Sequence, residues 1–227
     1  PIFVLADVMF LPVIENPGKV LCIGINYATH VRETGREMPT YPMIFTRFAD
    51  SQVAHLQPII RPKASHKLDF EGELAVVIGK TARHVKAADA LEYVAGYACY
   101  NDGSVRDWQK HTIQFVPGKN FPCTGGFGPW LVTCDEIGDP QDLELTTRLN
   151  GQVMQHTRTS DMIFDVRHLI EYCSTFTELA PGDVIVSGTT GGVGAFREPP
   201  VWMKPGDTVE VEISGIGILR NSIADEQ

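Results

Sequence analysis

Short apolar runs, separated by Gly, Pro or Asp, are the feature that most limits how this chain can fold. Runs of about five to seven residues are typical of strands, because an amphipathic helix needs a longer segment with a 3.6-residue period. They lie at 19–25, 73–79, 94–100, 130–134, 183–188 and 208–214. The chain should therefore be rich in β-structure.

One pair of strands is predicted by its turn rather than by its apolar residues. Asn150 and Gly151 stand between the segments LELTTRLN and GQVMQH. This dipeptide fits the two positive-φ positions of a type I′ turn, whose twist matches that of the flanking strands. Residues 143–156 are therefore predicted to form a β-hairpin.

Helical patterning is limited to four short segments, 27–34, 87–94, 104–112 and 165–174, with Ser104 as the expected N-cap of the third. These segments do not alternate regularly with the predicted strands, which argues against a doubly wound parallel sheet. The fold class predicted from this pattern is a strand-rich α+β fold.

Length and charge restrict the possible partners. The 227 residues favour one large domain, which we place at 19–227, with 1–18 as a lead-in segment that could be the remnant of a missing N-terminal domain. The formal net charge of −9 and the lack of a basic cluster argue against nucleic acid, and the apolar runs are too short to cross a membrane. Five scattered cysteines are typical of reduced thiols, so we expect a cytoplasmic protein.

An acidic segment stands out in the middle of the chain. If LDFEGELAVVIG is a strand, Asp69, Glu71 and Glu73 lie on one face, because side chains alternate with period two. Two carboxylates about 4 Å apart repel by roughly 4 kcal/mol at an effective dielectric constant near 20, and a cation would cancel this repulsion. Asp102 follows the apolar run GYACY and adds a carboxylate at a strand end. The alternative is a solvated strand face with Asp102 as a turn residue.

A second candidate group is the pair His30 and Glu33 in the segment GINYATHVRETG. Residues three apart share a helix face, and a carboxylate beside an imidazole holds one tautomer and strengthens the base. Taken alone, such a pair is more often an ordinary surface contact, so both interpretations stay open on spacing.

Five ordered blocks give the chain a resemblance to a known family. They read DFEGELAVVIG, GYACYNDGSVRDWQ, GKNFPCTGGFGPW, TRLNGQVMQ and DVIVSGTTGGVG. This series resembles the fumarylacetoacetate hydrolase family from residue 19 onward. The resemblance implies a mixed β-roll with short flanking helices, usually in a homodimer, and a single divalent cation, Mg²⁺ before Mn²⁺ or Ca²⁺, held by Glu71, Glu73 and Asp102.

The same resemblance implies roles for residues outside the acidic trio. His30 and Glu33 would lie on a mobile lid and activate the attacking water, and Lys119 would stabilise negative charge that develops on the substrate. The remaining implied substrate contacts are Arg106, Gln109 and Thr189. Many members of the family carry Pro at the position of Thr190, so the shape of that loop is not implied by the resemblance.

The function expected on these grounds is metal-dependent hydrolysis of a C–C bond. The substrate would be a small 2,4-dioxo acid, an acylpyruvate such as fumarylpyruvate, and the products pyruvate and a carboxylic acid. Two alternatives from the same family are a decarboxylase of oxaloacetate-like acids and an isomerase of hydroxymuconate-type dienoates. The alternative from another class is a metal-stabilised binding scaffold without turnover.

Overall fold

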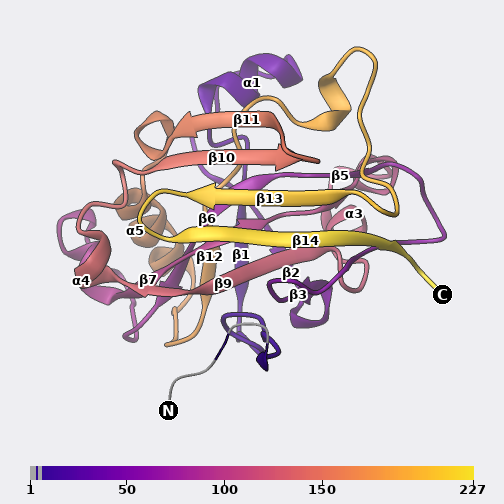
Figure 1. Ribbon diagram of the computed structural model, residues 1–227. Helices are drawn as coiled ribbons and strands as arrows, with labels where there is room; N and C mark the ends of the chain where they lie inside the picture. Colours follow the sequence, from indigo (N-terminus) through magenta and orange to yellow (C-terminus); the bar gives the residue numbers. More distant parts are fainter. Residues whose placement is uncertain (1–3, 5–6) are drawn as a thin grey trace.

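The computed structural model describes residue 4 and residues 7–227, and these residues form two stacked β-sheets (Figure 1). The larger sheet has seven strands, and only the pairs β1–β12 and β3–β9 within it are parallel. In spatial order its strands are β2 (Met43–Arg47), β1 (Val20–Gly24), β12 (Val184–Val186), β6 (Gly72–Ile78), β7 (Val94–Asn101), β9 (Gly125–Thr133) and β3 (Gln52–Val53).

The smaller sheet has five strands and lies in front of the larger one in Figure 1. Its strands, in spatial order, are β11 (Gln152–Arg158), β10 (Glu144–Leu149), β13 (Thr208–Ile213), β14 (Gly217–Asp225) and β4 (Ile59–Arg61). A separate two-stranded ribbon joins β5 (Leu68–Asp69) to β8 (Ser104–Val105). The strand-rich α+β fold expected from the sequence is confirmed.

The predicted hairpin is β10 and β11. Asn150 has φ 52° and Gly151 has φ 79°, as the two central positions of a type I′ turn require. All six apolar runs coincide with strands, although β9 begins at Gly125, five residues before the predicted segment.

Strand β6 lies at the centre of the larger sheet and is buried along its whole length. One face, with Leu74 and Val76, packs against Val211 and Ile213 of the smaller sheet and against α5. The opposite face carries Ala75 and Val77 and packs within a second apolar cluster. Burial on both faces explains the unbroken apolar run in this part of the sequence, since an exposed face would carry alternating polar residues.

The helices are short. They are α1 (Ala28–Thr34), α2 (Arg106–Gln109), α3 (Val116–Lys119), α4 (Cys134–Ile137) and α5 (Val166–Phe176), with 3₁₀ turns η2 (Ala49–Ser51), η3 (Ala87–Tyr93), η4 (Thr159–Asp161) and η5 (Gly194–Phe196). Helix α5 is the longest, and the Asp165 carboxylate caps it by accepting a hydrogen bond from the backbone N–H of His168. Among the described residues, no helix combines the length and apolar character needed to cross a bilayer.

Two of the four predicted helices differ from expectation. Residues 87–93 form a 3₁₀ turn, and the predicted helix 104–112 is reduced to α2. Ser104 does not cap α2, because it pairs with Asp69 in the ribbon and its hydroxyl donates to the Asp102 carbonyl. The proposed boundary after residue 18 stays a prediction, and residues 1–3 and 5–6 of that segment lie outside the described part of the chain.

Candidate metal centre

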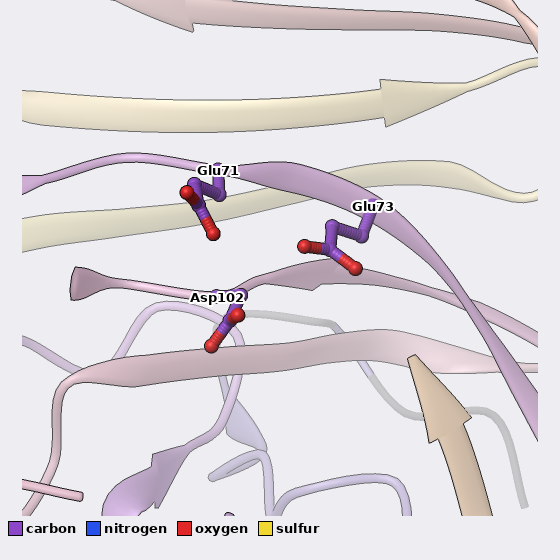
Figure 2. Close-up of side chains that lie close together, drawn as sticks. All are labelled: Glu71, Glu73 and Asp102. Atoms are coloured by element: carbon purple, nitrogen blue, oxygen red, sulfur yellow. The ribbon is translucent and has the colours of Figure 1, made fainter. Parts of the chain in front are cut away.

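Three carboxylates gather at one end of the β6–β7 pair, and Figure 2 shows the three side chains close together. Glu71 and Glu73 flank Gly72 at the start of β6, and Asp102 directly follows β7. One oxygen from each lies within 4.8 Å of the others, and all three residues are buried. The sheet register brings them together, because the Asp102 N–H donates to the Glu71 carbonyl at 2.8 Å.

Gly72 lets the smaller sheet approach this site closely. A Cβ atom at this position would stand 2.0 Å from the Thr147 hydroxyl oxygen of β10. A glycine between the two glutamates therefore fits the close contact between the sheets.

Buried cations surround the trio. The Lys119 ammonium, at the end of α3, contacts Glu71 Oε2 and Asp102 Oδ2 at 2.6 Å each. Arg106 Nη2 lies 2.7 Å from Glu71 Oε1, and Arg47 Nη1 donates to Asp102 Oδ1 at 2.6 Å. Glu73, in contrast, has no ion pair among the described residues and accepts the backbone N–H of Gly188.

The cations and carboxylates shift each other's protonation. Burial opposes ionisation of Glu71, yet Arg106 and Lys119 outweigh it and hold the pKa of Glu71 below its usual range. Burial, the Asp102 carboxylate and the Glu71 carboxylate together raise the pKa of Glu73 well above its usual value. Glu73 is thus the carboxylate whose negative charge is least compensated.

The charges at the site do not balance within the protein. Four buried carboxylates, including Asp69, face three buried cations, Arg47, Arg106 and Lys119. One negative charge is therefore in excess when all groups are ionised, and Glu73 is the uncompensated group. Three converging carboxylates with an excess negative charge suit a hard divalent cation such as Mg²⁺, Mn²⁺ or Ca²⁺. The residues present fit such an ion, and Glu71, Glu73 and Asp102 would hold it.

Asp69 does not join the trio, although it shares the period-two spacing. Its carboxylate accepts hydrogen bonds from Arg106 Nε at 2.8 Å and from the backbone N–H groups of Gly194 and Ala195 at 2.8 and 2.9 Å. Asp69 therefore connects Arg106 to the loop that follows β12.

Arg47 of β2 is a site residue that the sequence did not reveal. Its side chain is fully buried and also donates to the Gly103 carbonyl, Ser51 and Thr124. A Cβ atom at Gly125 would stand 2.7 Å from the Arg47 guanidinium, so this glycine provides the space that Arg47 fills. Nothing in the local segment MIFTR distinguishes Arg47 from a solvated strand residue.

The His30–Glu33 pair lies on α1, which is at the upper edge of Figure 1. His30 Nδ1 is 3.0 Å from Glu33 Oε2, and Glu33 Oε1 accepts the Gly192 N–H at 2.9 Å. Thr29 and Thr190 share a hydrogen bond at 2.9 Å, which adds a second contact between α1 and the glycine-rich loop 187–194. His30 is buried, so the pair is not an ordinary surface contact.

Gln155 of β11 supports the loop on its other side and was not predicted from the sequence. Its amide nitrogen donates to the Thr189 hydroxyl at 2.8 Å and the Thr190 carbonyl at 2.9 Å, and its amide oxygen accepts the Gly72 N–H. At Thr190 the loop is therefore held through the backbone carbonyl, which accepts a hydrogen bond from Gln155. The position of Gln155 in a hairpin gave no sign of this contact, because alternate hairpin residues usually face solvent.

A small pocket of about 60 Å³ brings part of the predicted site together. His30, Glu71, Glu73, Lys119 and Thr189 line it. The two remaining substrate-binding candidates lie elsewhere.

Arg106 is engaged by Glu71 and Asp69 and does not line the pocket. Gln109 accepts a hydrogen bond from Arg106 Nη1 at 3.0 Å and lines an adjoining groove. The two side chains thus lie behind and beside the pocket, and their contact with a substrate stays a prediction.

Comparison with known proteins adds three findings. The family model "Fumarylacetoacetate (FAA) hydrolase C-terminal" matches residues 19–224. The chain is 44% identical to oxaloacetate tautomerase FAHD2A, mitochondrial, from Bos taurus and 42% identical to its Homo sapiens counterpart, in each case over 98% of this chain and 72% of the relative.

Solved structures give the same fold. A 2-hydroxyhepta-2,4-diene-1,7-dioate isomerase from Mycobacterium marinum superposes with a TM-score of 0.85 at 41% identity, covering 98% of this chain and 80% of that one. A fumarylacetoacetate hydrolase from psychrophilic Exiguobacterium antarcticum superposes with a TM-score of 0.90 at 39% identity, with the same coverage.

These comparisons correct one expectation. The scattered thiols predicted a cytoplasmic protein, but curated relatives at 42–44% identity are named mitochondrial. The prediction is therefore wrong. Scattered cysteines are compatible with any reducing compartment and cannot distinguish one from another.

Proposed function

The chain belongs to the fumarylacetoacetate hydrolase family of enzymes, as the sequence blocks predicted, and on this premise we propose that it tautomerises a small 2-oxo acid with one bound divalent cation. Keto–enol tautomerisation moves a proton between the carbon beside a carbonyl group and the carbonyl oxygen. The proposal is supported by the names of the similar proteins, which include oxaloacetate tautomerases and isomerases of hydroxydienoates. Oxaloacetate is the first substrate to test.

One observation carries the proposal. His30, held by the Glu33 carboxylate, faces the same small pocket as both glutamates of the trio and the buried Lys119. Tautomerisation needs a group that accepts and returns a proton next to positive charge that stabilises the enolate. The pocket supplies both functions from its own residues.

His30 is the proposed proton carrier. Its Nδ1 contacts Glu33, which leaves Nε2 as the nitrogen that exchanges a proton with the substrate. In the keto-to-enol direction, the C3 proton passes to His30, and the C–H electron pair becomes the C2–C3 double bond as charge moves to the carbonyl oxygen. The His30 imidazolium, which the Glu33 carboxylate stabilises, then gives its proton to that oxygen, so the enol forms and His30 returns to its neutral state.

Lys119 is the proposed source of local positive charge from the chain itself. Burial opposes its charged form, but Asp102 and Glu71 outweigh this effect and raise the pKa of Lys119 above its ordinary value. Its ammonium therefore stays protonated and donates toward the carbonyl oxygen of the substrate. A divalent cation held by Glu71, Glu73 and Asp102 would supply further electrostatic stabilisation of negative charge on the substrate.

Hydrolysis of a C–C bond in an acylpyruvate is the second candidate. The His30–Glu33 pair supports it, because the same base deprotonates a water molecule as readily as a carbon acid when the substrate positions one. The similar structure described as a fumarylacetoacetate hydrolase also supports it. Decarboxylation of oxaloacetate would need the same pocket and releases CO₂.

One set of assays distinguishes these activities. Purified enzyme with Mg²⁺ is given enol-oxaloacetate, an acylpyruvate panel and keto-oxaloacetate, with ultraviolet absorbance, pyruvate and CO₂ as readouts. We expect rapid loss of the enol band, and a His30→Ala variant should lower this rate about 10²- to 10⁴-fold. His66→Ala is the matched control, because His66 is exposed and lies outside the pocket. Pyruvate release from acylpyruvates without tautomerase activity would favour the hydrolase instead.

The identity of the bound ion and the oligomeric state are also proposed. We propose Mg²⁺ as the resident ion, since small hard cations prefer carboxylate oxygens and keep positions open for a substrate. We propose a homodimer in solution, which light scattering of the purified protein tests directly.

A further inference from the structure

A groove of about 420 Å³ adjoins the small pocket and has an unusual charge for this protein. Arg36 and Lys110 line it, and none of its lining residues is an Asp or Glu. The chain as a whole carries a formal net charge of −9. A local pair of cations at the mouth of a pocket attracts an anion, and an anion would be repelled by the net negative charge of the chain as a whole.

Arg36 stands at the boundary between the pocket and the groove. It lines both spaces, as does Phe115, and its guanidinium carbon lies 5.7 Å from the centroid of the Phe115 ring. Within the part of the chain that the structure describes, its one side-chain hydrogen bond is a long contact of 3.9 Å to the Met43 sulfur. Among the described residues it has no carboxylate partner, and its side chain is exposed.

Lys110 lies across the same groove. Its ammonium is 5.8 Å from the centroid of the Phe196 ring, and that ring makes an edge contact with His30 at 6.3 Å between centroids. Lys110 also has no carboxylate partner within the described residues. Arg36 and Lys110 thus contact aromatic rings rather than carboxylates, which leaves their charged groups available to an anionic ligand.

We propose that Arg36 binds the distal carboxylate of a dicarboxylic 2-oxo acid, an inference that rests on the proposed function and specifies its substrate class. The 2-oxo acid end occupies the small pocket with His30 and Lys119, and the second carboxylate meets the guanidinium at the pocket boundary. Lys110 adds positive charge from the groove. Arginine suits this role because its planar fork of N–H donors matches a carboxylate.

The position of Arg36 gives this contact a second consequence. Arg36 follows α1 directly after Gly35, and its backbone N–H donates to the Val31 carbonyl at 3.3 Å. A substrate held by Arg36 therefore also holds the helix that carries His30. A substrate without the distal carboxylate lacks this tether.

The test compares two nearly isosteric substrates. Oxaloacetate carries the distal carboxylate, whereas acetylpyruvate has an acetyl group in its place. Arg36→Gln should raise the KM and the dissociation constant for oxaloacetate about 10- to 100-fold, the range expected for one charge-assisted contact. The values for acetylpyruvate should change less than about twofold. Arg36→Lys should recover part of the loss, and Lys110→Gln should cause a smaller loss than Arg36→Gln.

Two controls separate substrate binding from damage to the fold. Arg32→Gln removes a charge from α1, four residues before Arg36, at an exposed position that lines neither space, and its oxaloacetate KM should stay unchanged. Oxalate, which has no distal group, should bind Arg36→Gln and the unmodified enzyme equally in calorimetry with Mg²⁺.

Equal losses for oxaloacetate and acetylpyruvate, or no loss for either, would overturn the assignment of Arg36. Failure of the proposed function has a different result. In that case the unmodified enzyme turns over neither substrate, while calorimetry still shows whether oxaloacetate binding depends on Arg36.

Discussion

The two halves of the proposed catalytic apparatus are built in opposite ways. The carboxylate trio lies at one end of the β6–β7 pair, adjacent strands in the middle of the larger sheet, and its members are buried. The proton carrier belongs to α1, a seven-residue helix. A hydrogen bond between the Thr29 and Thr190 hydroxyls and one from the Gly192 N–H to the Glu33 carboxylate attach this helix to the loop 187–194. A helix this short depends on tertiary contacts for its stability. The cation site should therefore persist when the helix moves, and each half can be altered separately.

The largest expected effect on activity comes from removing one charge from the carboxylate trio. Glu73→Gln keeps an oxygen that accepts the Gly188 N–H, so the fold should be retained, but it removes a cation ligand. Several kcal/mol of electrostatic stabilisation correspond to a loss of about 10³-fold or more in kcat/KM. Calorimetry with Mn²⁺ measures the loss of metal affinity, and steady-state kinetics measure the loss of kcat/KM. Glu92→Gln, at an exposed position, is the control, and retained metal affinity in Glu73→Gln would contradict this account.

A smaller effect, on stability, should follow Asp102→Asn. Asp102 is paired with Arg47 and Lys119 in a buried environment, and its neutralisation leaves two cations with less compensation. Breaking a buried pair costs about 3–5 kcal/mol in the free energy of unfolding. Urea denaturation of the metal-free protein measures this loss, with Glu73→Gln as a matched control that breaks no ion pair. Equal stabilities of the two variants would show that the cations do not depend on Asp102.

On α1, Glu33→Gln should lower kcat about 10- to 100-fold, since one charge-assisted contact to His30 is weakened. The affinity for Mn²⁺ should not change, because Glu33 contacts none of the three carboxylates. A parallel loss of metal affinity would mean that α1 and the cation site are not independent.

The smallest effect is a difference in amide exchange within the unmodified protein. Without substrate, residues 26–37 should exchange faster than β6, because local opening of α1 breaks few contacts. Addition of oxalate with Mg²⁺ should slow exchange in 26–37 more than in β6. Equal protection of both segments in the substrate-free protein would exclude a mobile helix.

Sequence patterns predicted the carboxylate trio better than the contacts that surround it. Strand periodicity placed Glu71 and Glu73 on one face, the apolar run before Asp102 placed that residue at a strand end, and the family resemblance implied that the three belong to one site. These features are local, so they can be read from neighbouring residues. Asp69 has the same spacing yet pairs with Arg106, because the chain leaves β5 before β6 begins and the two strands belong to different sheets.

Contacts between distant segments could not be predicted. Arg47 and Asp102 are 55 residues apart, and Gln155 and Thr189 are 34 apart. Each pair meets only after the sheets have formed, so no short pattern indicates it. The predicted helix 104–112 was too long for a related reason. Ser104 belongs to β8, which pairs with β5, and this long-range interaction outweighs the preference of Ser104 for a helix cap.

Removal of the ion tests the central claim most directly. Protein treated with EDTA should lose at least about 10³-fold of its tautomerase activity, keep its circular dichroism spectrum, and recover activity when Mg²⁺ or Mn²⁺ is added. Full activity in the chelated protein would show that the three carboxylates do not hold a catalytic ion. Loss of the dichroism signal together with activity would show that the ion supports the fold rather than the reaction.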